Sequence, residues 1–345
     1  MKRQRLVWTL AFAAAAVPSV ARAQKDELFT SAKPLNLTIS TDLKALMSER
    51  DSLKLGPHSA KIAYAGTDGP AVSVEAELSL RGHWRRQKPN CEFAPIKVAF
   101  PKGKRAGTIF AGQGDLKLVT HCRNKDKEFE QYVLREYLVY QVYNTLTPVS
   151  LRARLVRASY QDTGPKGDSL TRWGFFIENE KKAAERLKSA ELELKGATWV
   201  DVDADQGALM SAFAYMIGAT DWALVALHNV LLYQDSTSGA VRPMVYDFDW
   251  TGLVNTKYSF PDYRLPIKSV RERIYRGICR KPEEWAPIVA KFQEKKAAIY
   301  AVYDSVPDLD PKYIKDTKLY LDEFYKVISD PRRMKQEMID TCKPA

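Results

Sequence analysis

The sequence is poor in the residues that build zinc sites. It contains only four cysteines and four histidines. The cysteines stand at Cys91, Cys122, Cys279 and Cys342, so no pair has CxxC spacing, and the histidines are scattered. Structural zinc sites draw Cys and His ligands at short, characteristic spacings. A zinc site is therefore not expected, and the cysteines are available for disulfides.

Long apolar runs are missing after residue 23, so we expect no transmembrane segment in the mature chain. Residues 1–23 have the form of a secretory signal peptide. Basic residues within 2–5 precede an apolar run at 6–17, and a small-x-small motif follows at 21–23. We expect cleavage after Ala23, and an uncleaved N-terminal anchor is the alternative.

Acidic residues are fewer than basic ones, which gives a formal net charge of +11. Loss of residues 1–23 would remove four basic residues and no acidic one, leaving about +7. A basic balance favours anionic partners such as phosphate, a nucleotide or an envelope polymer. The basic residues are dispersed and carry no nucleic-acid-binding signature, so no specific nucleic-acid partner is expected.

The signal sequence and the cysteines together predict a periplasmic or secreted protein with two disulfides. Four cysteines allow three connectivities. We favour Cys91–Cys122 with Cys279–Cys342, because each pair lies within one region of the sequence. Four independent buried thiols are the alternative.

Neither a Gly/Ser-rich linker nor an internal repeat divides the chain. The first half is rich in predicted strands, which we place by their apolar patterns at 35–40, 71–80, 96–100, 116–120, 151–160 and 172–177. A helix is expected from Asp42 with Thr41 as its N-cap. A long helix at 128–146 has apolar residues at helical spacing and ends at Thr147-Pro148.

The second half is mostly helical. We expect a helix at 206–217, a hairpin of strands at 230–234 and 242–246, and further helices near 283–304, 311–328 and 331–341. The predicted fold class is α+β with two lobes: a strand-rich N-terminal lobe at 24–180, and a helix-rich C-terminal lobe at 181–345 that carries the acidic motifs.

An acidic cluster surrounded by apolar residues is the most informative motif. Asp247 and Asp249 lie between Met244-Val245 and the aromatic side chains of Phe248 and Trp250. An ionised carboxylate is costly to bury unless it is paired, hydrogen-bonded or bound to a metal. The cluster therefore predicts a divalent cation held by both aspartates. A structural carboxylate pair held by arginines and backbone amides is the alternative.

Phosphoryl transfer needs a carboxylate at the acceptor, acidic and amide ligands for magnesium, and a lysine that an acidic residue orients. The chain offers each part in the order found in protein kinases, as Lys117, Glu136, Asp221, Asn229 and Asp247. The sequence therefore contains the components of a phosphotransferase site.

Six short motifs together resemble the spore coat protein H (CotH) kinase family between Leu78 and Arg280. They are Arg81-Gly82, Leu134-Arg135-Glu136, Gly174-Phe175-Phe176-Ile177-Glu178, Thr220-Asp221-Trp222, His228-Asn229 and Tyr246-Asp247-Phe248-Asp249-Trp250. The resemblance implies an atypical, reduced protein-kinase-like fold and phosphorylation of proteins outside the cytosol. It also implies that Asp221 is the catalytic base, Asp247 the magnesium ligand and Asn229 a second metal or phosphate contact. Only Gly82 stands where a phosphate-covering glycine loop is expected.

Several basic residues have more than one candidate role. Lys97 competes with Lys117 for the phosphate-binding role, and Glu136 is the acid expected to orient that lysine. Arg81 and Arg85 are candidates either for phosphate binding or for salt bridges to the acidic cluster.

The leading hypothesis is a CotH-like kinase that uses Mg²⁺ or Mn²⁺ to transfer phosphate from ATP to a hydroxyl of a protein or envelope polymer. A non-catalytic binding protein on the same fold is the first alternative. A metal-dependent hydrolase that uses Asp247 and Asp249 is the second.

Overall fold

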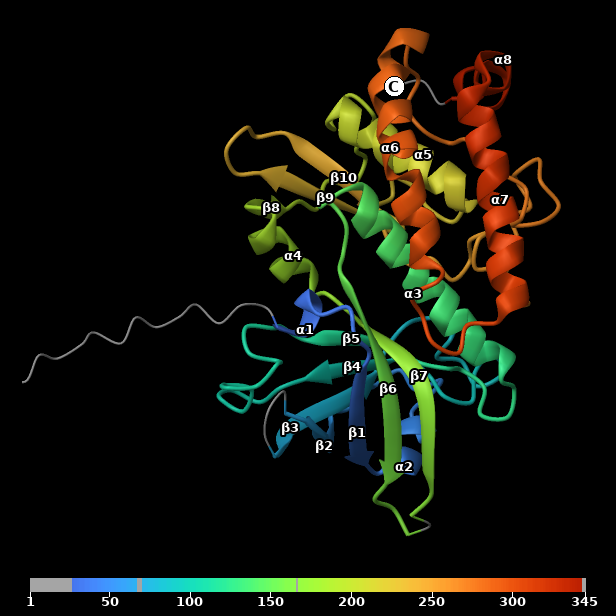
Figure 1. The fold of residues 1–345 in the computed structure, drawn as a ribbon. Helices are drawn as coiled ribbons and strands as arrows, with labels where there is room; N and C mark the ends of the chain where they lie inside the picture. The colour runs from blue at the N-terminus through green and yellow to red at the C-terminus, as the bar shows by residue number, and fades with distance from the viewer. Residues whose placement is uncertain (1–26, 67–69, 166, 343–345) are drawn as a thin grey trace, which may run out of the picture.

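The computed structural model describes residues 27–66, 70–165 and 167–342, so the predicted signal peptide lies outside it (Figure 1). Its central feature is a closed barrel of seven strands. The strands are β1 Leu35–Thr41, β2 His58–Ala65, β3 Ala71–Leu80, β4 Ile96–Ala99, β5 Leu116–Val119, β6 Ala153–Asp162 and β7 Ser169–Ile177. Their order around the barrel is β1-β2-β3-β4-β5-β7-β6.

The barrel shows that the predicted fold class, a two-lobe atypical protein-kinase-like fold, is wrong. Neighbouring strands are antiparallel except where β1 meets β6. There, seven parallel pairs from Leu35–Val156 to Thr41–Asp162 close the sheet on itself. Alternating side chains predict single strands but carry no information about which distant strand completes a barrel.

Helices and a small second sheet accompany the barrel. The helices are α1 Glu27–Thr30, α2 Leu43–Ser48, α3 Glu128–Leu146, α4 Glu180–Arg186, α5 Ala204–Ile217, α6 Ala286–Val302, α7 Pro311–Ser329 and α8 Pro331–Met334. The second sheet has the order β10-β9-β8 and consists of β8 Ser189–Glu191, β9 Val230–Asp235 and β10 Val241–Val245. Helix α3 lies between the barrel and the other long helices (Figure 1).

The cap of α2 corrects one local prediction. Asp42, not Thr41, is the N-cap, and its carboxylate accepts the Ala45 N–H at 2.8 Å. Thr41 remains part of β1 because its buried hydroxyl donates to the carbonyl of Ser59 at 2.9 Å. The bounds of β3 and α3, in contrast, are those predicted.

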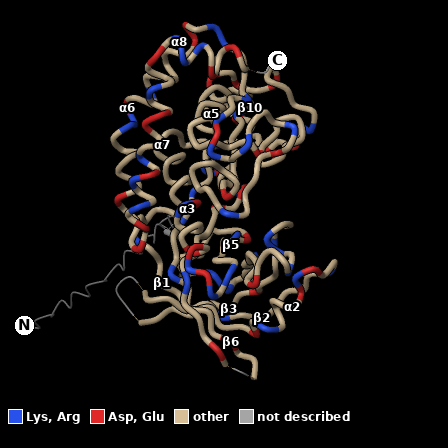
Figure 2. The backbone as a smooth tube through the Cα atoms, turned by 90° about the vertical axis from the view of Figure 1, so that its right-hand side faces the viewer, with Lys and Arg blue, Asp and Glu red and all other residues tan. Residues whose placement is uncertain are grey.

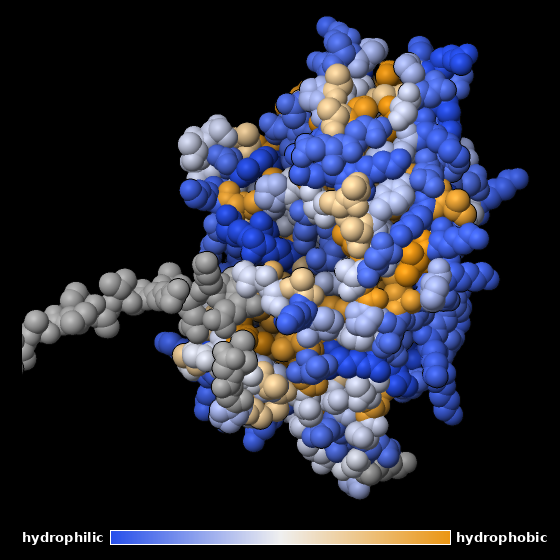
Figure 3. Space-filling view, in the orientation of Figure 1, coloured by the Kyte–Doolittle hydropathy of each residue, from blue (hydrophilic) through white to orange (hydrophobic). Residues whose placement is uncertain are grey.

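Two apolar cores hold the molecule together. One fills the barrel and includes Ile39, Ile62 and Leu78. The other surrounds α3, where the rings of Tyr143 and Phe213 stack with centroids 4.0 Å apart. On the face in Figure 3 polar residues predominate, and apolar residues show mainly where the barrel meets the helices. Helix α3 thus joins the barrel to the helical part through buried contacts.

Two disulfides confirm the predicted pairing. Cys91 is bonded to Cys122 and Cys279 to Cys342, with Cα atoms 4.7 and 5.0 Å apart. The first ties the segment after β3 to the one after β5, and the second ties the segment before α6 to the last described residues. Among the described helices, none has the length and apolar character needed to cross a membrane.

Candidate functional site

The three predicted aspartates meet in a cleft of about 330 Å³ beside the β9–β10 hairpin. Asp221, Asn229, Asp247 and Asp249 all line it. Arg81 and its neighbours, which follow β3, form the opposite side. Residues more than a hundred positions apart in the sequence thus surround one space.

The two ends of the hairpin have an unusual backbone. Asn229, just before β9, has φ of 52°, and Asp247, just after β10, has φ of 65°. Non-glycine residues rarely adopt this left-handed conformation, and such strain concentrates at functional sites. The Asp247 N–H donates to the Tyr140 hydroxyl at 3.1 Å, and the Tyr246 N–H donates to the Asn229 carbonyl at 3.1 Å. The hairpin and α3 therefore hold both residues in place.

Asp221 is oriented by two residues of the loop that follows it. His228 Nε2 lies 2.9 Å from one carboxylate oxygen of Asp221. The Asn229 amide nitrogen donates to the other carboxylate oxygen at 3.3 Å and to the Asp221 carbonyl at 2.8 Å. No helix among the described residues begins at Asp221, so it is not a helix N-cap. Its side chain is 48% exposed, and an incoming hydroxyl can therefore reach the carboxylate.

An arginine whose side chain is 11% exposed lies between two carboxylates in the cleft. Arg85 contacts Glu136 and Asp249, in each case with a nitrogen–oxygen distance of 3.6 Å. Tyr258 also donates a hydrogen bond to Asp249 at 3.1 Å. Arg85 was a candidate either for phosphate binding or for a salt bridge to the acidic cluster. Its contacts with the two carboxylates show the salt bridge.

Burial perturbs the acid–base properties of this cluster. It raises the pKa of Asp249 to about 6, although Arg85 opposes the change. Burial likewise raises the pKa of Glu136 well above its ordinary value, and Arg85 again opposes. Burial would lower the pKa of Arg85, but Asp249 and Glu136 outweigh it and raise that pKa. The arginine therefore remains charged while the two carboxylates bind protons more readily than usual.

Arg81 differs from Arg85 in its contacts. Its side chain lines the cleft and forms no hydrogen bond or ion pair with any residue in the described ranges. Its backbone N–H donates to the Pro95 carbonyl at 2.9 Å, which fixes the chain at this point. Arg81 is thus the cleft arginine that remains available to a phosphate.

The predicted lysines lie outside the lining of the cleft. Lys117 forms an ion pair with Glu180 of α4, and its ammonium lies 5.4 Å from the centre of the Tyr246 ring. Lys97 contacts Asp115 at 3.5 Å, with both side chains about half exposed. Glu136 pairs with Arg85, so the structure does not bring together the lysine and the acid expected to orient it.

Sequence reasoning missed Tyr140 and Tyr258 as parts of the site. Tyr140 lies four residues after Glu136 on α3, and this spacing puts both on one face of the helix. The spacing could have identified Tyr140 as a neighbour of Glu136. No sequence pattern could have identified Tyr258, because it lies in an irregular segment nine residues after Asp249.

A metal would have few protein ligands here. No group of three or more His, Cys, Asp or Glu side chains within the described ranges is arranged to hold a metal ion. Magnesium commonly takes one or two carboxylates and completes its shell with water and phosphate oxygens. Asp247 and Asn229 fit that pattern, because both line the cleft. The Asn229 amide nitrogen donates its hydrogen bond to Asp221, so its amide oxygen is the atom that could bind a metal.

One further hollow adjoins the cleft, and another lies along the β8–β9 region. One, of about 430 Å³, shares Asp221 and Trp250 with it and is bordered by Phe260 and Tyr263, which are 62% and 93% exposed. The other, of about 390 Å³, is lined by Tyr246 and leucines of the β8–β9 region, and also by Glu191, Glu193 and Lys195. Exposed aromatic side chains of this kind are typical of binding surfaces.

Charge is otherwise mixed along the molecule. Acidic and basic residues are interspersed over both the barrel and the helical part (Figure 2).

Comparison with protein-family models and with curated proteins finds no match to this chain. The resemblance to CotH kinases consequently rests on the sequence motifs alone.

Proposed function

We propose that this protein is a metal-dependent phosphotransferase that moves a phosphoryl group from ATP to a hydroxyl group. The observation that carries the proposal is the meeting of Asp221, Asn229 and Asp247 in one cleft, opposite the unpaired Arg81. These residues supply a base, two metal ligands and a phosphate-binding cation, which are the main requirements of phosphoryl transfer.

Asp221 accepts the proton of the attacking hydroxyl. His228 and Asn229 orient its carboxylate, while its exposure leaves room for the acceptor. The carboxylate acts here by positioning the hydroxyl and taking its proton late in the transfer.

Asp247 and the Asn229 oxygen would hold Mg²⁺ or Mn²⁺, and the bound ion would neutralise charge on the phosphates. Arg81 contacts phosphate oxygens from the opposite side. The recess at Tyr246 offers leucine side chains to the nucleoside, and the Lys117 ammonium lies 5.4 Å from the centre of the Tyr246 ring.

The protein would act on a protein or polymer hydroxyl in the periplasm or outside the cell. The two disulfides support an oxidising compartment. The aromatic hollow next to Asp221 supports a large acceptor, because it adds about 430 Å³ of space beside that carboxylate.

A non-catalytic binding protein is the second candidate. The pairing of Glu136 with Arg85 and of Lys117 with Glu180 favours it, since the ion pair expected to orient the phosphate-binding lysine is not made. Such a protein would bind its partner through the same cleft without transferring phosphate.

Phosphate transfer from γ-labelled ATP, with Mg²⁺ or Mn²⁺, tests the proposal on the disulfide-bonded protein. We expect Asp221→Asn to reduce transfer by roughly 10²- to 10⁴-fold, the usual contribution of a general base. Asp247→Asn is expected to reduce transfer and to raise the metal concentration required. The matched control is Asp168→Asn, which makes the same change at an exposed loop residue.

Three outcomes separate the candidates. Transfer by wild type and Asp168→Asn, but not by Asp221→Asn, supports the phosphotransferase. No heat of nucleotide binding in calorimetry with metal, together with no transfer, supports the binding protein. Wild-type transfer no greater than that of Asp221→Asn contradicts the catalytic proposal.

A further inference from the structure

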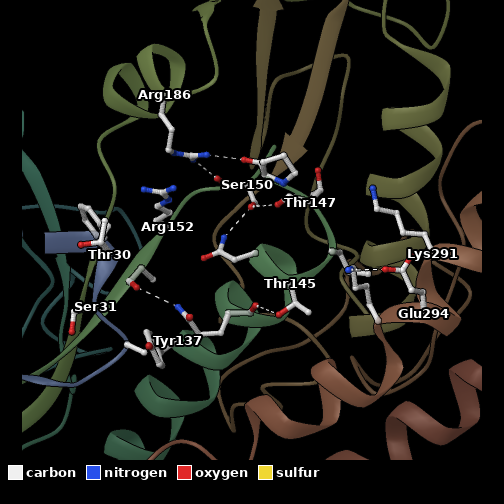
Figure 4. A pocket seen from close by; sticks show the side chains of 18 residues that line it. Thr30, Ser31, Tyr137, Thr145, Thr147, Ser150, Arg152, Arg186, Lys291 and Glu294 are labelled. Atoms are coloured by element: carbon white, nitrogen blue, oxygen red, sulfur yellow. Dashed lines mark hydrogen bonds and ion pairs between the residues drawn. The ribbon is translucent and has the colours of Figure 1, made fainter. Parts of the chain in front are cut away.

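A larger cavity, of about 690 Å³, lies on another face of α3 (Figure 4). Its walls come from the end of α1, the last turns of α3, the start of β6, the end of α4, and α6. It shares no lining residue with the acidic cleft, which Glu136 and Tyr140 of the same helix support from the other side. The proposed phosphotransfer makes no use of it.

One wall is built around a buried ion pair. Glu178 is 1% exposed, and both of its oxygens accept hydrogen bonds from Arg186 at 2.8 Å. The same guanidinium donates to the carbonyls of Pro148 and Ser150 at 2.9 and 2.8 Å. The Arg152 N–H also donates to Glu178, at 3.0 Å. Arg186 thereby fixes α4 to the loop after α3.

The floor of the cavity is fixed in a similar way. The Asn144 amide nitrogen donates to the Ser150 hydroxyl at 2.9 Å and to the Leu151 carbonyl at 2.8 Å. The Ser150 hydroxyl in turn donates to the Thr147 carbonyl at 2.7 Å. These bonds order the loop before any ligand binds, which lowers the entropic cost of binding.

The lining is basic. Arg152 and Arg186 stand on one side of the cavity and Lys291 on the other (Figure 4), and Lys295 also belongs to the lining. Glu294 is the single acidic lining residue, and it pairs with Lys295 at 2.8 Å. Lys291 forms no hydrogen bond or ion pair with the residues that the structure describes. Arg186 is paired with Glu178 and Lys295 with Glu294, but Lys291 still offers a positive charge that can attract an anion.

The uncharged part of the lining consists largely of hydroxyl and amide groups. The Tyr137 hydroxyl has no hydrogen-bond partner in the described part of the chain, and burial raises the pKa of Tyr137 to about 12, so it stays protonated. Gln141 uses its nitrogen to bond the Ala153 carbonyl at 3.2 Å, which leaves its oxygen as an acceptor. Such groups suit a ligand with many hydroxyls better than an apolar one, and the volume is typical of a small-molecule site.

We propose that this cavity binds an acidic carbohydrate, a sugar that carries a carboxylate or phosphate. Lys291 pairs with the acidic group. Tyr137, Gln141 and Asn144 hydrogen-bond the sugar hydroxyls. The site is a binding site separate from the phosphotransfer cleft, and it would hold the protein on an anionic glycan.

Calorimetric titration of the full, disulfide-bonded protein tests this proposal. The probes are a galacturonate disaccharide, its uncharged methyl ester, glucose 6-phosphate and inorganic phosphate. We expect the acidic sugars to bind about tenfold or more tightly than the methyl ester, because a charge-assisted hydrogen bond is lost with the charge. Comparison of galacturonate with glucose 6-phosphate identifies which acidic group is preferred.

Variants connect the binding to the cavity. Lys291→Glu is expected to weaken the acidic sugar at least about tenfold, and Tyr137→Phe to weaken it to a smaller extent with folding retained. Lys315→Glu makes the same charge change on the exposed face of α7 and is expected to bind as wild type does. Asp221→Asn should also bind normally, which separates this site from the catalytic proposal.

Equal affinity for the disaccharide and its methyl ester would overturn the proposal, as would wild-type affinity in Lys291→Glu. Inorganic phosphate that binds as tightly as glucose 6-phosphate and galacturonate would show a simple anion site and overturn the carbohydrate assignment.

Discussion

Asp249→Asn should make the protein more stable at neutral pH. Asp249 is 7% exposed, and its pKa is about 6 instead of 3.8. Burial therefore destabilises the charged carboxylate more than the nearby Arg85 stabilises it. Asparagine keeps the shape of the side chain and an oxygen that can accept the Tyr258 hydrogen bond. Arg85 retains Glu136 as its partner. The substitution therefore removes a poorly stabilised charge and leaves its neighbours paired.

The size of the effect follows from the pKa. The difference between 3.8 and about 6 corresponds to roughly 3 kcal/mol at pH 8, where the folded protein must carry the charge. Between about pH 4 and pH 6 the folded state holds this proton and the unfolded state has released it, so the carboxyl lowers stability as pH rises through that window. The advantage of asparagine should consequently shrink to roughly 1.5 kcal/mol at pH 5.

Urea unfolding of wild type and variant at pH 5 and pH 8, under non-reducing conditions, measures both quantities. Asp168→Asn is the control, and as an exposed substitution it should change the free energy of unfolding by about 0.5 kcal/mol or less at either pH. A variant less stable than wild type at pH 8 would refute the reasoning. So would a stability difference that is the same at both pH values, because the cost would then not come from ionisation of Asp249.

Three further substitutions test other parts of the fold. Arg186→Ala leaves the buried Glu178 carboxylate without its partner and should lower the free energy of unfolding by roughly 3–5 kcal/mol in urea; a loss under 1 kcal/mol would contradict its role as a fixed wall. Replacing Cys279 and Cys342 by serine opens a loop of 63 residues and should cost roughly 4 kcal/mol, seen as a lower thermal midpoint than wild type without reductant. Gly174→Ala puts a Cβ 2.8 Å from a carbonyl oxygen of β5 and should destabilise the barrel by about 1–3 kcal/mol; an unchanged melting temperature would show that the strands can separate slightly.

Local patterns in the sequence predicted single elements well. In β3 the residues Val74, Ala76, Leu78 and Leu80 are buried and alternate with exposed ones, because one face of the strand meets the barrel interior. In α3 the helical spacing of apolar residues and the following Thr147-Pro148 defined both ends. These signals are strong because they depend only on neighbours along the chain.

Predictions that required distant partners were weaker. Strand β2 was missed because Ala60, Ala63 and Ala65 blur the contrast between its two faces. The closure of the barrel depends on the parallel pairing of β1 with β6, for which neither strand has a local signature. The fold class consequently could not be read from the patterns that located the strands.

The candidate site shows the same division. Asp221 and Asn229 lie eight residues apart, and their contact follows from a short loop. The partner of Lys117 could not be foreseen, because Glu180 stands 63 residues away at the start of a helix that the sequence patterns did not reveal. Side-chain pairing across elements depends on the packed backbone, and a lone acid and lysine in the right chain order cannot establish it.

The parallel pairing of β1 with β6 also determines when the barrel can be completed. Ser40 and Gln161 are partners in this pairing and lie 121 residues apart. During synthesis β1 can pair with β2 at once, but its other edge stays open until β6 has emerged, and an open edge is a template for unwanted association. Contacts this distant along the chain form slowly. Barrel closure is therefore a late step of folding, and the nascent chain depends on protection of its first strand until that step.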